Sequence, residues 1–520
     1  MKRNILYTLL LLLVVSMSSC NDRLDIEKHG NMGSMDDFYQ TDEEVDEAIA
    51  SLYLTIKSAY FNWSFITNAL SDDAWAAGGQ RGDNAELEKL NEYRFGADES
   101  MIQGLYSGLY SIIYKANLII DKTTADTQEK KRAVAEAKFW RAWSHFELVT
   151  LWGTAPVVDH LLTTDEYRPS NSTPEELWAI VESDLTSSIE SGALPSKSDV
   201  NDSTTTIRVT KEVAQAMLGK AYLFEKKYDQ AADMLNAVIS SGKYALYTGN
   251  YGNIMHVETN NCCESMLEIQ MRDDDTQMWS QFTMQFLMLG WRTDYMSLTG
   301  QAASEISTGT YGFMNPRASV YEAFVADEGV DGYRLNNTIK TYDQMKAYGA
   351  SLQSGVTMYG NEGYFNWKNR ALKSDCVTDA SYFQALQYID LRIMRYAEVI
   401  LLAAEANLEA GNTAKALEQI NMIRNRAQLS SLTSVTLDDI KTEKRLELWM
   451  ENTRYQDLVR WGDAETVLKD QGAEIPSFTE SGVVWNYQNS DYGFKTKNKL
   501  LPIPLKELEL NPNMSQNENW

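Results

Sequence analysis

The hydrophobic and polar positions of the chain follow their most regular pattern between residues 389 and 461. Within 395–410, and again within 413–427, apolar residues recur every three or four positions, so each segment has one apolar face. This pattern predicts two amphipathic helices. The Gly411–Asn412 pair between them predicts the end of the first helix and a short connection, so that the two helices pack antiparallel as a hairpin.

Other segments repeat this helical period. Residues 214–240 place Leu218, Gly219, Tyr222 and Ala231 at the spacing of a tetratricopeptide repeat, in which small residues let two helices approach closely. Further helices are expected around 105–121, around 133–152 and, as a charged third helix after the hairpin, up to Leu458–Gly462. The pattern predicts a mainly α protein built from tetratricopeptide-type hairpins.

Between about 246 and 385 the helical period fades. Gly, Asn, Thr, Tyr and Trp become frequent there, and no repeat is visible. Long loops inside a compact protein are usually functional. We therefore expect an irregular, loop-rich lobe that lies over the helical wall and meets the ligand.

Several ordered motifs lie along the chain. They are Glu136–Ala142, Leu151–Pro156, Met394–Ala406, Ile420–Ala427, Glu443–Leu448, Asp457–Trp461, Leu501–Pro504 and Asn511–Asn517. Together they resemble the SusD/RagB family of outer-membrane nutrient-binding, starch-binding-type lipoproteins, in which the first two correspond to an early helix and the turn after it. The resemblance spans nearly the whole mature chain.

This resemblance implies a fold and a partner. The fold is an α-α superhelix of about four helical hairpins, with its scaffold at about 41–245 and 386–520 and the irregular lobe at about 246–385, all in one SusD-like domain, 41–520. The function it implies is capture of an oligo- or polysaccharide at the cell surface and delivery to a SusC-like TonB-dependent outer-membrane transporter. The helical wall would face the transporter, and the protein would act as a hinged lid.

The amino terminus predicts the location of the protein. Lys2 and Arg3 precede an apolar run from Leu9 to Val15, which is shorter than the ~20 residues of a membrane span and matches a secretory signal. Small residues just before Cys20 resemble a lipobox. We expect residues 1–19 to be removed, Cys20 to carry the lipid, and residues 20–40 to form the tether of a protein anchored in the outer membrane and facing outward.

Composition excludes some functions. Loss of Lys2 and Arg3 takes the net charge from −26 to −28, which would repel nucleic acid. No motif of a zinc protease or serine hydrolase is present, so no catalytic residue, cofactor or metal is predicted. We interpret Glu443, Glu447 and Glu451 as a structural ion network neutralised by nearby arginines, namely Arg445, Arg454 and Arg460. The Asp273–Asp275 run reads as a solvated turn.

Two segments combine aromatic residues with planar polar groups, which is the composition that a sugar site requires. The first contributes Asp72, Asp73, Trp75 and Arg81. The second contributes Trp279, Trp291, Arg292 and Tyr295. In the family, loops in these positions form the ligand arc, and position alone transfers them to this chain. For Trp75, binding and core packing are equally compatible with the sequence, whereas the polar neighbours of Trp291 and Tyr295 slightly favour binding.

Three other functions stay open on the sequence. A peptide-binding lid of the same type of transporter keeps the fold and changes the ligand. A surface glycoside hydrolase needs only two suitably spaced carboxylates, and an acidic chain offers many such pairs. A tetratricopeptide scaffold would bind soluble protein partners instead.

Overall fold

The computed structural model describes residues 38–274, 284–377 and 385–520. Its helices are α2 (Asp42–Ala69), α3 (Ala85–Asn91), α4 (Ser100–Lys122), α5 (Gln128–Trp152), α6 (Pro174–Glu190), α7 (Lys211–Phe224), α8 (Tyr228–Ser240), α10 (Gln285–Met288), α11 (Gly300–Glu305), α12 (Ala318–Glu328), α13 (Tyr333–Thr338), α14 (Tyr342–Tyr348), α15 (Tyr396–Glu409), α16 (Thr413–Arg426), α17 (Leu437–Glu447), α18 (Arg454–Trp461), α19 (Ala464–Val467) and α20 (Leu505–Leu510). Its strands are β1 (Ala74–Ala77), β2 (Ser265–Ile269), β3 (Met296–Leu298), β4 (Phe313–Pro316), β5 (Ile339–Thr341), β6 (Ala350–Leu352), β7 (Met358–Tyr359), β8 (Tyr364–Asn366), β9 (Leu391–Arg395), β10 (Glu474–Thr479) and β11 (Gly482–Tyr487).

The long helices begin and end at residues whose chemistry favours a cap. Thr41 forms a capping box with Glu44 at the start of α2, and the same box recurs at the start of α6, where Pro174 occupies the first turn. Gly153 ends α5 with a φ of +73°, which favours glycine. Because the caps are local, the helix boundaries follow closely from the sequence.

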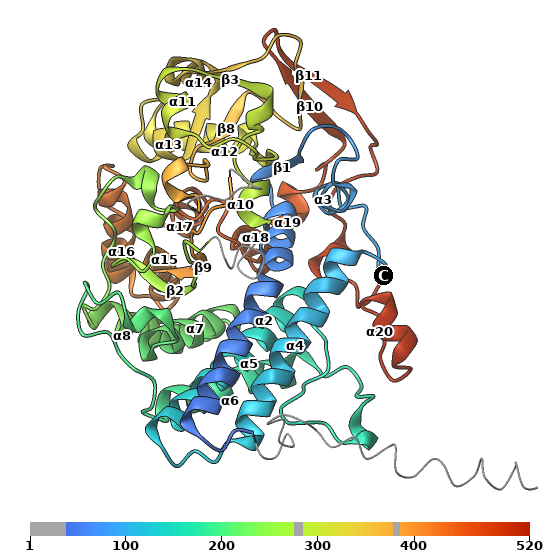
Figure 1. The fold of residues 1–520 in the computed structure, drawn as a ribbon, viewed down its shortest axis with the longest axis vertical. Coiled ribbons are helices and arrows are strands. Elements are labelled where there is room, and N and C mark those ends of the chain that lie inside the picture. The colour runs from blue at the N-terminus through green and yellow to red at the C-terminus, as the bar shows by residue number, and fades with distance from the viewer. Residues whose placement is uncertain (1–37, 275–283, 378–384) are drawn as a thin grey trace, which may run out of the picture.

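The long helices pack in chain order as a curved wall, which confirms the predicted mainly helical fold (Figure 1). Within the described residues they form four successive pairs: α2 with α4, α5 with α6, α7 with α8, and α15 with α16. The hairpin predicted from Gly411 and Asn412 is confirmed, because α15 ends at Glu409 and α16 begins at Thr413.

The irregular lobe is inserted between two neighbouring helices of this wall. Although α8 and α15 are separated by more than 150 residues, they pack directly against each other. Asn236 of α8 and Asn407 of α15 exchange side-chain hydrogen bonds of 3.2 and 3.1 Å. The chain therefore leaves the wall after α8, forms the lobe with helices α10–α14 and short two-stranded sheets, and re-enters the wall at α15, next to α8.

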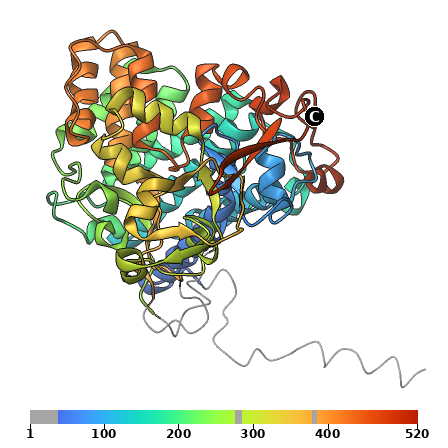
Figure 2. The ribbon, with the colours of Figure 1, turned by 90° about the horizontal axis from the view of Figure 1, so that it is seen from above.

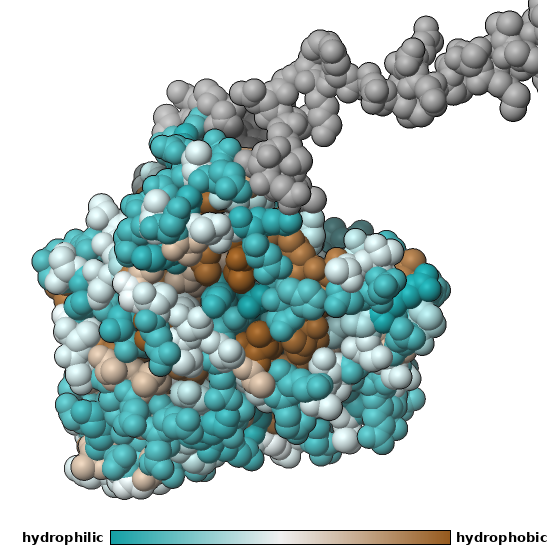
Figure 3. All heavy atoms as spheres, turned by 90° about the horizontal axis from the view of Figure 1, so that it is seen from below, coloured by the Kyte–Doolittle hydropathy of each residue, from teal (hydrophilic) through white to brown (hydrophobic). Residues whose placement is uncertain are grey.

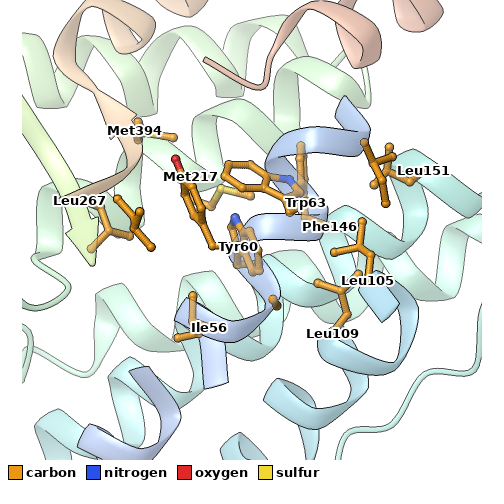
Figure 4. Close-up of a cluster of buried hydrophobic side chains, with 14 of the residues drawn as sticks. Ile56, Tyr60, Trp63, Leu105, Leu109, Phe146, Leu151, Met217, Leu267 and Met394 are labelled. Carbon is orange, nitrogen blue, oxygen red and sulfur yellow. The ribbon is translucent and has the colours of Figure 1, made fainter. Parts of the chain in front are cut away.

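The main core runs through the helical wall and reaches the strand pair β2–β9, and Figure 4 shows part of it. In that part, Tyr60 and Trp63 of α2 lie between side chains of other helices and those of β2 and β9. Met217 comes from α7, while Leu267 and Met394 come from the antiparallel pair β2–β9. A second, smaller core inside the lobe contains Trp291, Met345, Phe365 and Trp367.

The predicted charged third helix is wrong in one respect, because it forms two helices. After α17 ends at Glu447, Met450 and Asn452 adopt φ angles of +63° and +66°, in the left-handed region that no continuing α-helix contains. The Asn452 side chain accepts a 2.7 Å hydrogen bond from Asn68 at the end of α2. Docking onto α2 therefore separates α17 from α18.

Candidate ligand-binding site

Strand β1 leads into a loop, Gly78–Asp83, which we call the loop site together with the side chains that reach it. β1 pairs antiparallel with β4, and the Gly78 N–H continues this contact by donating to the Gly312 carbonyl at 3.1 Å. Gly78 turns the chain with a φ of +102°. The Gly79 N–H then donates to Asp83 Oδ2 at 2.6 Å, so the loop is closed by its own side chain.

The two segments selected from the sequence meet at this loop. Arg292 Nη1 lies 3.2 Å from Asp83 Oδ2, and the Tyr295 hydroxyl donates to the Gly79 carbonyl at 3.3 Å. The Arg292 guanidinium also lies 4.7 Å from the centre of the Tyr295 ring, which is a cation–π contact. Tyr295 is half-buried, so part of its ring faces solvent beside the loop.

Arg81 lies exposed on the other side of the loop. It donates to the Tyr359 hydroxyl at 3.0 Å and, through Nη2, to Glu92 Oε2 at 2.9 Å. The hydrogen bonds that Arg81 donates to Glu92, together with the one that it donates to Tyr359, raise the pKa of Arg81. The loop site thus presents two partly exposed tyrosine rings whose neighbouring charges are already paired.

Trp75 lies in β1, just before the loop, and its side chain is buried. Its ring is 5% exposed, and its Nε1 donates to Glu362 Oε1 at 2.7 Å. The Arg317 guanidinium lies 3.6 Å from one ring centre, and the Trp485 ring meets Trp75 edge-on at 5.9 Å. Of the two roles that the sequence left open for Trp75, core packing describes its position here.

Asp72 and Asp73 are buried and paired with arginines of the scaffold, which corrects the prediction that they face the ligand. Arg454 donates to both oxygens of Asp72 at 2.8 and 3.0 Å, and Arg445 donates to Asp73 at 2.8 Å. Burial alone would raise the pKa of Asp72, but Arg445 and Arg454 outweigh it and lower the pKa to about 2. Burial raises the pKa of Asp73.

The prediction of Trp291 as an exposed platform is also wrong. Its side chain is 1% exposed and stacks on Trp367 with ring centres 6.3 Å apart and planes 11° from parallel. Neighbouring Thr293 is buried too, and only Arg292, Asp294 and Tyr295 reach the surface. A polar run was therefore a poor guide to the exposure of the tryptophan that precedes it. Trp279 and Cys20 lie outside the described residues.

Sequence reasoning missed the hairpin β10–β11. This hairpin joins β7 in a three-stranded sheet of order β11-β10-β7, and it carries the exposed rings of Trp485 and Tyr487. Viewed from above, the red hairpin lies beside the yellow part of the lobe (Figure 2). The alternating Val483–Tyr487 run after Gly482 was a signal that could have found it.

The three glutamates of α17 and the segment after it form the predicted structural ion network, although with different partners. Arg334 lies 2.6 Å from Glu443 and 3.2 Å from Glu447, and Arg395 lies 2.6 Å from Glu451. Burial acts to raise the pKa of Glu447, but its arginine neighbours outweigh burial and lower it. Arg445 and Arg454, which the sequence assigned to these glutamates, bind Asp73 and Asp72 instead.

The remaining features to consider are the Asp273–Asp275 run, possible metal ligands and possible membrane spans. Asp274 forms a 2.6 Å ion pair with Arg272, and Asp275 lies outside the described residues. Over the described ranges 38–274, 284–377 and 385–520, no three His, Cys, Asp or Glu side chains are grouped as metal ligands would be. In those same ranges no helix has the length and hydrophobicity needed to cross a bilayer.

The surface also has grooves outside the loop site. Two adjoining grooves, of about 590 and 820 Å³, run between α4 and residues 156–169 and share Tyr110, Val158, Leu162 and Tyr167. These segments lie toward the lower end of the molecule in Figure 1, whose underside is mostly hydrophilic with apolar side chains gathered in a central hollow (Figure 3). The grooves contain none of the residues of the loop site.

Solved structures with a similar fold bind glycans according to their titles. One, a laminarin binding SusD-like protein, is 27% identical with a TM-score of 0.78 over 93% of this chain and 100% of that one. Another, surface glycan-binding protein A from Bacteroides thetaiotaomicron, is 23% identical with a TM-score of 0.73 over 92% and 99% of the two chains and supports the fold alone.

The relatives that match this chain in sequence are SusD-like proteins as well. A SusD-like protein of Bacteroides ovatus is 25% identical over 85% of this chain and 80% of its own length, and the starch-binding protein SusD of Bacteroides thetaiotaomicron is 23% identical over 89% and 86%. The family model "Starch-binding associating with outer membrane" matches residues 24–223, and the model "SusD family" matches residues 263–520. On these matches and its fold, the chain belongs to the SusD/RagB family.

Proposed function

We propose that this protein binds a neutral glycan at the loop site and delivers it to a TonB-dependent transporter in the outer membrane. The observation that carries the proposal is the meeting of Tyr295 and Arg292 with the loop Gly78–Asp83. Tyrosine rings offer flat faces to the C–H faces of sugars, while the loop offers backbone groups and guanidinium N–H donors to hydroxyls.

The charges at the site favour a neutral ligand. Arg292 is paired with Asp83 and Arg81 with Glu92, so an anionic glycan would have to displace a carboxylate from a guanidinium. The net charge of −26 opposes anionic polymers as well. The titles of similar proteins name laminarin and starch, which are suitable first probes.

The transporter and the anchor are part of the same proposal. Their support is membership of the family, together with the family model whose description names association with the outer membrane. We propose Cys20 as the lipid attachment site, after removal of residues 1–19, with 20–40 as tether to a single domain, 41–520. Cys20→Ala should move the protein from the membrane fraction to the soluble fraction of fractionated cells, and unchanged membrane association would contradict lipidation as the tether.

Native affinity electrophoresis in gels containing laminarin or starch tests the binding step. Wild-type protein should be retarded by at least one polymer, and Tyr295→Ala should lose most of that retardation. Tyr114, an exposed tyrosine on α4 in the groove distant from the loop, provides the control Tyr114→Ala, which should migrate as wild type. Retardation that survives Tyr295→Ala would remove the loop site from the proposal.

A peptide-binding lid is the second candidate, and one observation favours it. Strand β11 is an edge strand of its sheet, and such an edge can accept an extended peptide as an additional strand. Calorimetric titration with a protein digest and with laminarin separates the two ligands. Binding heat with the digest and none with laminarin would favour a peptide ligand.

Release of reducing ends from laminarin or starch would instead indicate a glycosidase, and we expect no such release.

A further inference from the structure

The outer strand of the β10–β11 hairpin is unusually apolar for an exposed edge. Trp485 is 48% exposed and Tyr487 67% exposed, and Val483 and Val484 are exposed as well. Exposed apolar residues scattered singly are normal, whereas contiguous ones mark a binding surface. Nothing in the proposed loop site accounts for these rings.

We propose that Trp485 and Tyr487 form an aromatic track that binds the continuation of a glycan chain held at the loop site. This inference rests on the proposed function and adds a preference for long ligands. A polymer that contacts both places gains affinity because its second contact is intramolecular.

The strand geometry aligns the two rings. Side chains two residues apart in a strand lie on the same face, about 7 Å apart along the strand. Trp485 and Tyr487 meet this condition within β11, which pairs regularly with β10 from Glu474↔Tyr487 to Thr479↔Gly482. The Ser490 N–H donates to the Tyr487 hydroxyl at 3.0 Å, so this ring is held in place although it is exposed.

The track is close enough to the loop site for one ligand to reach both. The Trp485 ring contacts Trp75, with centres 5.9 Å apart. Trp75 precedes Gly79 by four residues, which span at most ~14 Å when extended. The Trp485 ring therefore lies within roughly 25 Å of the loop carbonyl that Tyr295 contacts.

The chemistry of the hairpin favours a neutral, hydroxylated polymer over a protein partner. Between Thr479 and Ser490 the only charged residue is Glu480, and Gln488 and Asn489, which directly follow Tyr487, carry planar amides. A protein strand added to the edge would use the backbone of β11 and would contact both faces of the strand, including Val484. A glycan needs only the face that carries the rings.

The test compares a short and a long ligand by isothermal titration. Laminaritriose probes the loop site alone, and laminarin probes the loop site with the track. Trp485→Ala and Tyr487→Ala should each weaken laminarin binding roughly tenfold, the effect of losing an aromatic contact of about 1.4 kcal/mol, and should leave the affinity for laminaritriose unchanged. Trp485→Phe should keep most of the affinity, and Val484→Thr, on the opposite face, should behave as wild type.

The outcomes separate the two proposals. Failure of the wild type to bind laminaritriose, starch oligosaccharides or either polymer would overturn the proposed function. Normal binding of laminarin by both alanine variants would overturn the track and leave the loop site intact. A loss of laminarin binding in Val484→Thr equal to that in Trp485→Ala would also overturn it, because the effect would then belong to the whole strand.

Discussion

Asp72 accepts two hydrogen bonds from Arg454, to one carboxylate oxygen from Nε at 2.8 Å and to the other from Nη2 at 3.0 Å, although 382 residues separate them in the chain. This pair joins the turn after α2 to the first residue of α18. Arg445 of α17 lies 2.9 Å from the same carboxylate. One acidic side chain therefore links the segment before β1, which leads into the loop site, to the carboxyl-terminal part of the scaffold.

Asp72→Asn should destabilise the fold by about 3 kcal/mol, because Arg454 would stay charged and largely buried without its partner, while Arg445 would keep only Asp73. Urea unfolding measures this change. Asp83→Asn, on the exposed loop, is the matched control and should cost less than about 1 kcal/mol. Unchanged stability with lost glycan binding would return Asp72 to the ligand site.

Trp291→Ala should also act on stability rather than directly on ligand. Removal of a large side chain from a packed core costs about 3–5 kcal/mol, and Trp291 fills the lobe core against Trp367. Trp291→Phe should cost less, because it keeps a ring in the same space. Thermal unfolding of both variants and the wild type measures these differences in stability. A melting temperature within a degree of wild type for Trp291→Ala would show that this core is not as packed as its burial indicates.

The scaffold was far more predictable from the sequence than the site. Helix caps such as Thr41 and stops such as Gly411 act within a few residues, so they appear in the sequence as they act in the structure. The ion pairs of Asp72 and Glu447 depend on residues hundreds or tens of positions away. Proximity in sequence therefore assigned Arg445 and Arg454 to the wrong carboxylates.

Exposure at the loop site had the same difficulty. Trp291 and Tyr295 lie four residues apart in one polar run, yet only the second reaches solvent, because Trp367 covers the first. That contact comes from the packing of the lobe, which has no repeat to reveal it. Composition selected the two segments and the family resemblance implied that they meet, whereas neither gave the orientation of each ring.

Glu147 predicts a specific pH dependence of stability. This buried carboxyl of α5 accepts a 3.0 Å hydrogen bond from Gln456, and burial raises its pKa from 4.5 to about 7, against the opposing effect of Lys220. The folded protein therefore holds the proton more tightly than the unfolded chain. Stability from this group is complete below about pH 4.5 and is lost as the pH rises toward and beyond 7.

Glu147→Gln removes this ionisation, so the variant should gain stability relative to wild type between pH 5 and pH 8, by up to about 3 kcal/mol. Urea midpoints at several pH values measure the difference. Glu129→Gln, at an exposed position of the same helix, should show no such trend. A difference between Glu147→Gln and wild type that is the same at every pH would show that folding does not raise the pKa of Glu147.

Two neighbouring glycines give the sharpest probe of the loop site. A Cβ on Gly79 would lie 2.5 Å from Arg292 Nη1, at the end of a flexible side chain, and the backbone of Gly79 is not left-handed. Gly79→Ala should therefore push Arg292 away from Asp83 at a cost of about 1 kcal/mol, since this ion pair is partly exposed. The displaced guanidinium alters the surface beside Tyr295, so laminarin binding should weaken severalfold.

Gly78→Ala is the matched control, because it perturbs the fold rather than the surface. Gly78 has a φ of +102°, and its added Cβ would lie 2.5 Å from the ring of Phe313 in β4. Strain and this contact should lower the free energy of unfolding by at least about 1–3 kcal/mol. Calorimetric titration with laminarin, paired with thermal unfolding of both variants, separates the two effects. Laminarin binding by Gly79→Ala with wild-type affinity would mean that Arg292 and its loop lie outside the contact with ligand.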